Sequence, residues 1–121
     1  MMARKGYSSE LIAKKELESK YGDGVFKLAM WQRTDYVVLR PDSKEVGQII
    51  EVKEVHINEK RKRYYPNQKE KRNIRRMLKF CDKRQIPFYL WIYYIKGRGK
   101  KRTKDIWDKA DIIYDIFDGK Y

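Results

Sequence analysis

Val46-Gly-Gln-Ile-Ile-Glu-Val-Lys-Glu-Val55 is the stretch of sequence from which the architecture can be worked out. Its Val and Ile content, following the turn residues Pro41-Asp42-Ser43, predicts a strand over residues 46–57. Side chains alternate along a strand, so Glu51 and Lys53 are expected on the same face. A carboxylate and an ammonium on the face of an apolar strand are costly to bury unless each has a partner.

A second strand is expected at Asp35–Arg40, and a hairpin of the two strands would bring Asp35 and Glu51 together at one end. Two adjacent carboxylates repel each other unless a divalent cation neutralises them. The simpler alternative is that Glu51 and Lys53 are solvated edge charges, which contribute little to stability. Glu51-Val52-Lys53 alone is compatible with both a metal-binding carboxylate pair and solvated edge charges. Features elsewhere in the chain are needed to distinguish them.

The composition favours a polyanionic partner. The chain has 121 residues, which fits one domain, and 30 Lys and Arg against 17 Asp and Glu give a net charge of +13. Nine basic residues lie between Lys60 and Arg76 and six between Lys96 and Lys104, whereas residues 105–121 contain five Asp and two Lys. Any single cluster could be a solvated face, but two clusters flanking the carboxylate strand favour a nucleic-acid groove.

Several classes of protein are disfavoured. Cys81 is the only cysteine, so an internal disulfide is impossible and a reducing, cytoplasmic compartment is expected. The longest apolar stretch, Ile86–Ile95, is too short to span a membrane, and no apolar leader follows Met1. His56 is the only histidine, which argues against a zinc site or a Ser-His-Asp triad. It is expected on the opposite face of its strand from Lys53.

The remaining elements complete an α/β pattern. We expect a helix from Ser8 or Ser9 to Tyr21, a strand at Val25–Trp31, a helix capped by Asn67 and ending near Lys83, and a buried strand at Ile86–Lys96. The tail is ambiguous, because it has helical spacing of apolar residues while 112–114 could be a strand. The order α-β-β-β-α-β predicts a mixed central sheet flanked by helices.

The aromatic residues are assigned mainly to the core. Trp31, Trp91 and Trp107 are expected to be buried rather than to stack on bases. Tyr64-Tyr65-Pro66 lies inside the first basic cluster. It could stack on an unpaired base or pack over the sheet, and both interpretations stay open.

The ordered set of acids resembles the PD-(D/E)XK nuclease superfamily, whose signature here is Thr34-Asp35, fifteen residues, and then Glu51-Val52-Lys53. The resemblance is closest to the archaeal Holliday-junction resolvases. Those open with Arg-Lys-Gly and a Glu four residues later, as Arg4-Lys5-Gly6 and Glu10 do here. Their second helix begins near a Gln, here Gln68, and a strand with a Pro-aromatic start follows it.

The resemblance covers about residues 4–99 of a single domain, 1–121, and leaves 100–121 as a basic loop and an acidic tail. Two positions depart from the family, with Leu11 in place of an Arg and Thr34 in place of the usual Pro. The resemblance implies a restriction-endonuclease-like fold. It also implies an endonuclease that hydrolyses DNA with Mg²⁺, or with Mn²⁺ as a substitute. In its most specific form the resemblance implies a homodimeric resolvase of branched, four-way junctions.

Roles for individual residues follow from the same resemblance. Asp35, Glu51, the carbonyl of Val52 and Glu10 would bind metal, while Lys53 and Gln68 would act on the attacking water or the phosphate. The basic residues assigned to DNA, with one tyrosine, are Arg4, Lys5, Lys60, Arg61, Lys62, Arg63, Tyr64, Lys69, Arg72, Arg76, Lys100, Lys101 and Arg102. The alternatives are another endonuclease of this fold, acting on duplex, flap or single strands, and a non-catalytic nucleic-acid-binding protein.

Overall fold

The computed structural model describes residues 9–28, 35–41, 43, 45–97 and 101–118. Its five strands form one sheet in the order β1-β2-β3-β4-β5. The elements are α1 (Ser9–Tyr21), η2 (Gly22–Gly24), β1 (Val25–Leu28), β2 (Asp35–Leu39), β3 (Val46–Ile57), α2 (Gln68–Arg84), β4 (Phe88–Lys96), β5 (Lys101–Trp107) and α3 (Lys109–Phe117). Neighbouring strands are antiparallel except β3 and β4, which are parallel and are joined by the crossover helix α2. The predicted mixed sheet flanked by helices is confirmed.

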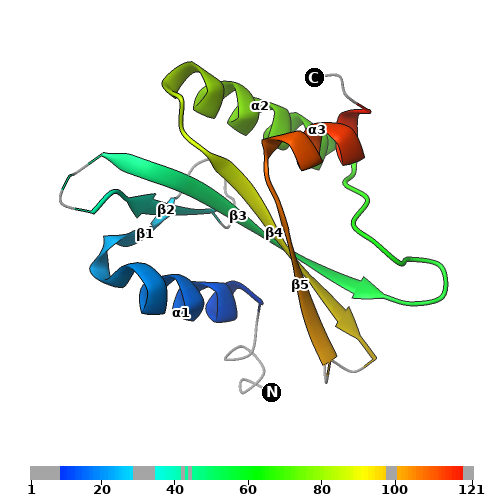
Figure 1. Ribbon diagram of the computed structural model, residues 1–121. Coiled ribbons are helices and arrows are strands. Elements are labelled where there is room, and N and C mark those ends of the chain that lie inside the picture. The colour runs from blue at the N-terminus through cyan, green and yellow to red at the C-terminus, as the bar shows by residue number, and fades with distance from the viewer. Residues whose placement is uncertain (1–8, 29–34, 42, 44, 98–100, 119–121) are drawn as a thin grey trace.

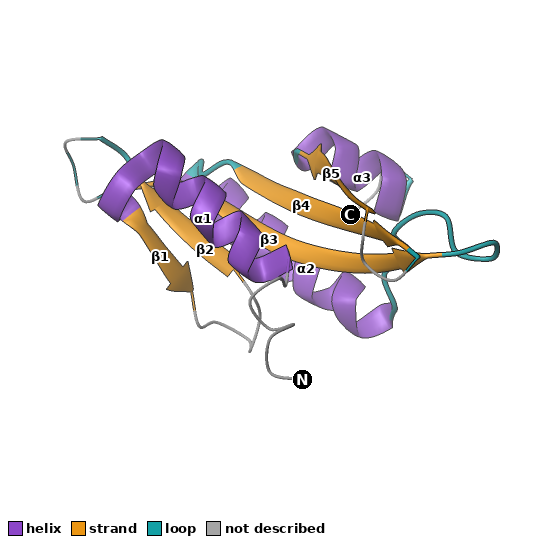
Figure 2. Ribbon diagram, turned by 90° about the horizontal axis from the view of Figure 1, so that it is seen from below, coloured by secondary structure: helices purple, strands orange, loops and turns teal. Residues whose placement is uncertain are grey.

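The sheet is covered on both faces. Helix α1 lies on one face, and α2 and α3 lie on the other (Figures 1 and 2). Alternation along β3 divides its side chains between two cores, since Ile50 and Val52 pack in the cluster under α1 while Ile49 and Val55 pack in the cluster under α2 and α3. Glu51 and Lys53 therefore belong to the α2 face, and His56 to the face opposite Lys53, as predicted.

Helix α1 is anchored at its first residue by a carboxylate from β3. The backbone N–H and the hydroxyl of Ser9 donate to Glu54 Oε1 at 3.1 and 2.5 Å. Burial opposes ionisation of Glu54, but the Ser9 hydroxyl and N–H, and then Arg102 and His56, lower its pKa on balance. One of the unpaired donors at the start of the helix is satisfied in this way, and Ala13 and Leu17 are held against the sheet.

Helix α2 confirms the prediction most closely. Asn67 caps it by accepting from the N–H of Glu70, and the Glu70 side chain accepts in return from the N–H of Asn67. The buried stripe consists of Ile74, Met77, Leu78 and Cys81. The helical period of 3.6 residues places these four side chains on one face, so Cys81 belongs to the core.

The C-terminal region corrects one expectation and resolves another. Lys101–Lys104, expected in a basic loop, belongs to the edge strand β5, which pairs antiparallel with β4. Exposed charges line this strand because its outer edge and much of one face meet solvent, so the sequence lacks the apolar alternation of a typical strand. Residues 112–114 lie in helix α3, which Asp108 caps through a capping box with Asp111. The strand alternative for 112–114 is wrong.

The remaining differences are at boundaries. Strand β1 ends at Leu28 in the described chain, and Trp31 lies outside the described residues. Strand β4 begins at Phe88, two residues later than expected, after the helix has closed with Gln85 in a left-handed conformation. Trp91 and Trp107 are buried, as predicted. No helix among the described residues has both the length and the apolar character that a bilayer crossing requires.

Candidate active site

Asp35 and Glu51 are register partners, so the predicted hairpin is confirmed at the backbone. Strand β2 begins at Asp35, and its pairing with β3 runs from there to Leu39. Within the described residues, β3 beyond Glu51 is paired only with β4. The two positions therefore stand where β2 and β3 part, although the Asp35 side chain lies outside the described part of the structure.

Glu51 is the buried charge of this site. It is 1% exposed, and its Oε2 lies 2.7 Å from Nζ of Lys53, which is itself 13% exposed. The two residues are two positions apart on one strand and share a face, so the alternation that defines the strand also brings the charges together. Breaking a buried ion pair by removing one partner typically costs about 3–5 kcal/mol. The interpretation of Glu51 and Lys53 as solvated edge charges is wrong.

A third ionised group, Glu70, reaches the same ammonium from helix α2. Its Oε2 lies 3.4 Å from Lys53 Nζ, and the Tyr64 hydroxyl donates to that oxygen at 3.2 Å. Sequence reasoning missed Glu70, which stood out only as an acid in a basic cluster. The available signal was its place three residues after the cap Asn67, because a side chain in the first turn of the crossover helix lies above the parallel strands.

The surroundings of Glu70 keep it ionised. Burial alone would raise its pKa, but the hydrogen bond from the N–H of Asn67, the charge of Lys53 and the donors from Lys53 and Tyr64 together lower the pKa of Glu70. Lys53 is thus held between two carboxylates, one from its own strand and one from the helix. The arrangement fixes a cation at the point where β2 and β3 separate.

Glu10 is not brought to this group. It lies on α1, on the opposite face of the sheet, and its carboxylate is 2.8 Å from Nζ of Lys27 in β1. Ala13 and Leu17 are the residues that point into the sheet, and Glu10, 36% exposed, lies beside that stripe. The ion pair with Lys27 thus places Glu10 on the α1 side of the sheet, and its assignment to the metal site stays a prediction.

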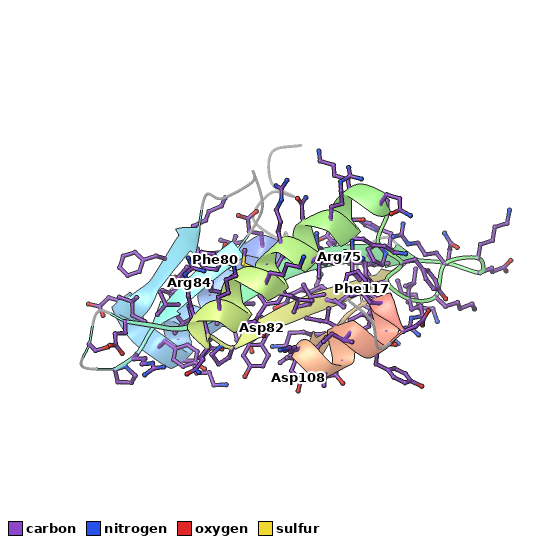
Figure 3. All side chains as sticks on the ribbon, turned by 90° about the horizontal axis from the view of Figure 1, so that it is seen from above. Arg75, Phe80, Asp82, Arg84, Asp108 and Phe117 are labelled. Carbon is purple, nitrogen blue, oxygen red and sulfur yellow. The ribbon has the colours of Figure 1, made fainter. Side chains whose placement is uncertain are left out.

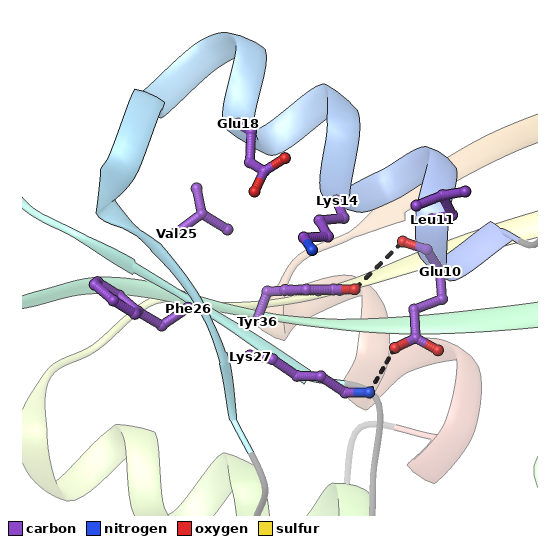
Figure 4. A pocket seen from close by; sticks show the side chains of 8 residues that line it. All are labelled: Glu10, Leu11, Lys14, Glu18, Val25, Phe26, Lys27 and Tyr36. Atoms are coloured by element: carbon purple, nitrogen blue, oxygen red, sulfur yellow. Dashed lines mark hydrogen bonds and ion pairs between the residues drawn. The ribbon is translucent and has the colours of Figure 1, made fainter. Parts of the chain in front are cut away.

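Glu10 instead borders a hollow of about 520 Å³ between α1 and β1, which Figure 4 shows. The Tyr36 hydroxyl points to the carbonyl of Glu10 at 3.4 Å. Burial, and then the charge and hydrogen bonding of Glu10, raise the pKa of Tyr36 to about 12. Tyr36 stays neutral at physiological pH, and Leu11 also lines the hollow.

Gln68 is likewise in a different place from the one expected. It is exposed at the start of α2 and lines a groove between α2 and α3. Successive helical residues are about 100° apart, so Gln68 and Glu70 point to opposite flanks of the helix. The residue of the first turn of α2 that reaches Lys53 is Glu70.

The two adjacent tyrosines, Tyr64 and Tyr65, have different environments, and each fits a different one of the two interpretations. Tyr64 is 3% exposed and packs against Trp107, with ring centroids 6.2 Å apart, so the assignment of Tyr64 to DNA contact is corrected to a place in the core. Tyr65 is 60% exposed. The guanidinium of Arg63 lies over the rings of Tyr65 and Trp107 and forms an ion pair with Asp115 of α3.

Most of the other basic residues assigned to DNA lie on the surface. Arg4, Lys5 and Lys100 lie outside the described residues. Arg63 and Arg102 are half-buried, while the exposed ones are Lys60, Arg61, Lys62, Lys69, Arg72, Arg76 and Lys101. Except for Arg102 and Lys101 in β5, these residues lie in the loop after β3 and on α2. The described basic surface thus begins next to the Glu51–Lys53–Glu70 group.

Comparisons with known proteins assign neither a family nor a function to this chain. No family model, no curated protein and no solved structure matches this chain. Among the described residues, no three His, Cys, Asp or Glu side chains come together as metal ligands. Interpretation of the site therefore rests on its own geometry, in which Glu51 has its backbone partner Asp35 on one side and Lys53 within ion-pair distance.

Proposed function

We propose that this protein is a metal-dependent endonuclease of the PD-(D/E)XK superfamily, which hydrolyses phosphodiester bonds in DNA. The observation that carries the proposal is the register of the hairpin. It sets Asp35 opposite Glu51, while Lys53 lies 2.7 Å from the Glu51 carboxylate. A nucleic-acid-binding protein has no need of Asp35, Glu51 and Lys53 together, whereas a metal-dependent nuclease uses all three.

The order of the elements supports the restriction-endonuclease-like fold as part of the same proposal. A helix precedes three antiparallel strands, and a crossover helix leads to a fourth strand parallel to the third. This is the α-β-β-β-α-β order that the sequence predicted. Strand β5 and helix α3 extend the sheet and cover one face beyond that common core.

The oxygens at this point suit Mg²⁺. Carboxylates are ligands that Mg²⁺ accepts in small number, with water completing its shell. Glu51, Asp35 and the carbonyl of Val52 would hold the ion, and burial of Glu51 at 1% exposure gives it a carboxylate that has lost its water shell. Glu10, held by Lys27 on the other face, does not fit this set. Bound there, Mg²⁺ supplies an acidified water and offsets charge on the phosphate.

The chain's own residues contribute positioning and charge. The Lys53 ammonium, fixed by Glu51 and Glu70, stabilises the negative charge that develops on the phosphate oxygens. Glu70 acts through Lys53 and is a positioning residue, with Tyr64 holding its carboxylate in turn. The exposed lysines and arginines of α2 and the preceding loop hold the DNA backbone, which positions a duplex without reading its sequence.

A branched substrate is the most specific form of the proposal. Backbone contacts select the shape of the nucleic acid rather than its bases, and the net charge of +13 supplies the attraction. A four-way junction is resolved by two symmetric nicks, which require two active sites and hence a homodimer with two-fold symmetry. We therefore propose a junction-resolving dimer in a reducing, cytoplasmic setting.

A cleavage panel tests the function. A four-way junction, a linear duplex, a flap and a single strand are each incubated with Mg²⁺, Mn²⁺ or EDTA, using the wild-type protein and Asp35→Ala. Paired metal-dependent nicks on the junction alone, lost in the variant, are the expected result. Cutting of the other substrates would retain the nuclease and reject the resolvase. If the wild-type protein binds these substrates but cleaves none of them, the nuclease proposal is rejected in favour of a non-catalytic nucleic-acid-binding protein.

A further inference from the structure

A second cationic groove lies between α2 and α3, with a volume of about 420 Å³. Helix α2 contributes Gln68, Lys71, Arg75 and Lys79 to its lining, and the end of α3 contributes Phe117 and Asp118. Figure 3 shows the two helices on the same face of the sheet, with Arg75 and Phe117 labelled on neighbouring helices.

The basic side chains of the groove are regularly spaced. Lys71, Arg75 and Lys79 are four residues apart, which places them about 6 Å apart along one flank of the helix. The guanidinium of Arg75 lies 4.8 Å from the centre of the Phe117 ring. This contact restricts a flexible side chain while leaving its donors available, as stacked arginines at phosphate sites do.

The acids of the C-terminal region do not neutralise this row. Asp108 and Asp111 cap α3, Asp115 pairs with Arg63, and Lys109 of α3 pairs with Asp82. Among the described residues that line the groove, only Asp118 is acidic. No ion pair joins Lys71, Arg75 or Lys79 to an acid in the described part of the chain. The groove therefore keeps a net positive charge.

The groove and the candidate active site lie on opposite flanks of α2. Glu70 points to Lys53, whereas Gln68 and Lys71 face α3. A helix with its side chains is about 10–12 Å across, so one phosphate group cannot contact both flanks. Any ligand of the groove is separate from the phosphate that would lie at Lys53.

We infer that the α2–α3 groove binds a second stretch of nucleic-acid phosphate backbone, away from the bond that is cut. The inference rests on the proposed function and adds a contact that the resemblance does not imply. Phosphates of one strand rise about 3.4 Å apart along the axis of duplex DNA, so a row of cations about 6 Å apart and parallel to that axis would span roughly two phosphate steps. Arg75 supplies the bidentate donor and the two lysines supply point charges.

The test compares two triple charge reversals that change the net charge equally. One is Lys71→Glu, Arg75→Glu and Lys79→Glu in the groove. The matched control is Lys14→Glu, Lys15→Glu and Lys20→Glu, on α1 across the sheet, where all three side chains are exposed. Affinity for a linear duplex and a four-way junction is measured in EDTA from about 50 to 200 mM salt, and thermal unfolding confirms that both variants fold.

The groove variant should weaken binding at least tenfold and lower the slope of log K against log salt by about two to three, since each lost phosphate contact removes about 0.9. The single change Arg75→Gln should lower the slope by about one and guards against misfolding of the triple variant. In steady-state cleavage the groove variant should raise KM and leave kcat unchanged, as loss of uniform binding requires.

Equal losses in the groove and control variants would overturn the inference, because bulk charge alone would then account for binding. Unchanged binding by a folded groove variant would also overturn the inference. The nuclease proposal would still stand in that case if the wild-type protein cleaves DNA. A wild-type protein that binds duplex and junction but cuts neither would reject the nuclease, and the salt slopes would still decide the groove. Failure of the wild-type protein to bind either DNA would overturn both.

Discussion

Lys53 on β3 and Glu70 on α2 meet across the crossover between two parallel strands, with Nζ and Oε2 3.4 Å apart. The first turn of α2 thereby touches the residue two positions after the buried Glu51. The Glu70 side chain that pairs with Lys53 also completes the capping box at the start of α2. The position of the Lys53 ammonium is therefore coupled to the start of the helix. The candidate site thus depends on where the helix begins as well as on the residues of the strand.

Glu70→Gln should lower kcat about tenfold and leave KM nearly unchanged, a loss of about 1.4 kcal/mol. Gln can still complete a capping box, so the helix start is preserved while the charge beside Lys53 is lost. Steady-state cleavage of the preferred substrate measures both constants. Asn67→Ala is the control, since it removes the cap but keeps the carboxylate. If it lowers kcat equally at matched stability, the cap and not the charge is what matters.

Glu51→Ala should abolish cleavage and leave DNA binding unchanged or tighter, because a negative charge is removed from the proposed phosphate site. Cleavage in Mg²⁺ and binding in EDTA are measured on the same substrate. The variant also leaves Lys53 without its nearest carboxylate, so its folding is checked by thermal unfolding. Parallel loss of cleavage and binding in a folded variant would mean that Glu51 has a structural role.

Mn²⁺ should raise the thermal unfolding temperature of the wild-type protein, since a ligand at 100 times its Kd adds about 2.7 kcal/mol by mass action. Asp35→Ala should lose this gain. Glu10→Ala should keep it, because Glu10 pairs with Lys27 on the opposite face of the sheet. Loss of the gain in Glu10→Ala would return that residue to the metal site and contradict the geometry described above.

Glu54→Gln should destabilise the fold by about 1 kcal/mol at pH 7, because the Ser9 donors would face a neutral acceptor. The folded-state pKa of Glu54 lies below its ordinary value, so its contribution is present above the unfolded pKa and is lost as pH falls through the folded pKa. Urea unfolding at pH 7, 5 and 3 should show the difference from wild type shrinking on acidification. Exposed Glu59→Gln is the control, and a difference that does not vary with pH would exclude the carboxylate as its source.

Binding to DNA should weaken steeply with salt, since several phosphate contacts release counterions. Between about 50 and 200 mM salt the wild-type affinity for a duplex should fall by orders of magnitude. The measurement is a fluorescence anisotropy titration at each salt concentration. A flat dependence would remove the basic surface from the explanation of binding.

Much of this fold could be predicted from the sequence, because several elements are determined by residues close together in the chain. The Val and Ile content of residues 46–57 predicted β3, and Asn67 marked the start of α2. The spacing of Ile74, Met77, Leu78 and Cys81 indicates the buried face of that helix. Strand β5 could not be predicted in this way. Its charged residues form a strand because β4 offers a backbone edge, which is a tertiary cause that composition does not reveal.

The residues of the candidate site also fall into two groups, those placed by local structure and those placed by tertiary packing. Asp35, Glu51 and Lys53 lie on adjacent strands, and register fixed their relation. Glu10 and Gln68 were assigned from chain order, but order does not say which face of the sheet or which flank of α2 a side chain takes. Glu70 was missed for the same reason, since its importance arises only once α2 has packed over β3.

The ammonium of Lys53 beside Glu51 also bears on how the protein is made. Structural metal sites tie folding to metal supply, because their ligands repel one another until the ion arrives. Here the chain carries its own counter-charge to the buried acid, so the newly synthesised polypeptide can complete its core without an ion. Under the metal-dependent function proposed above, binding of the ion would therefore follow folding rather than drive it.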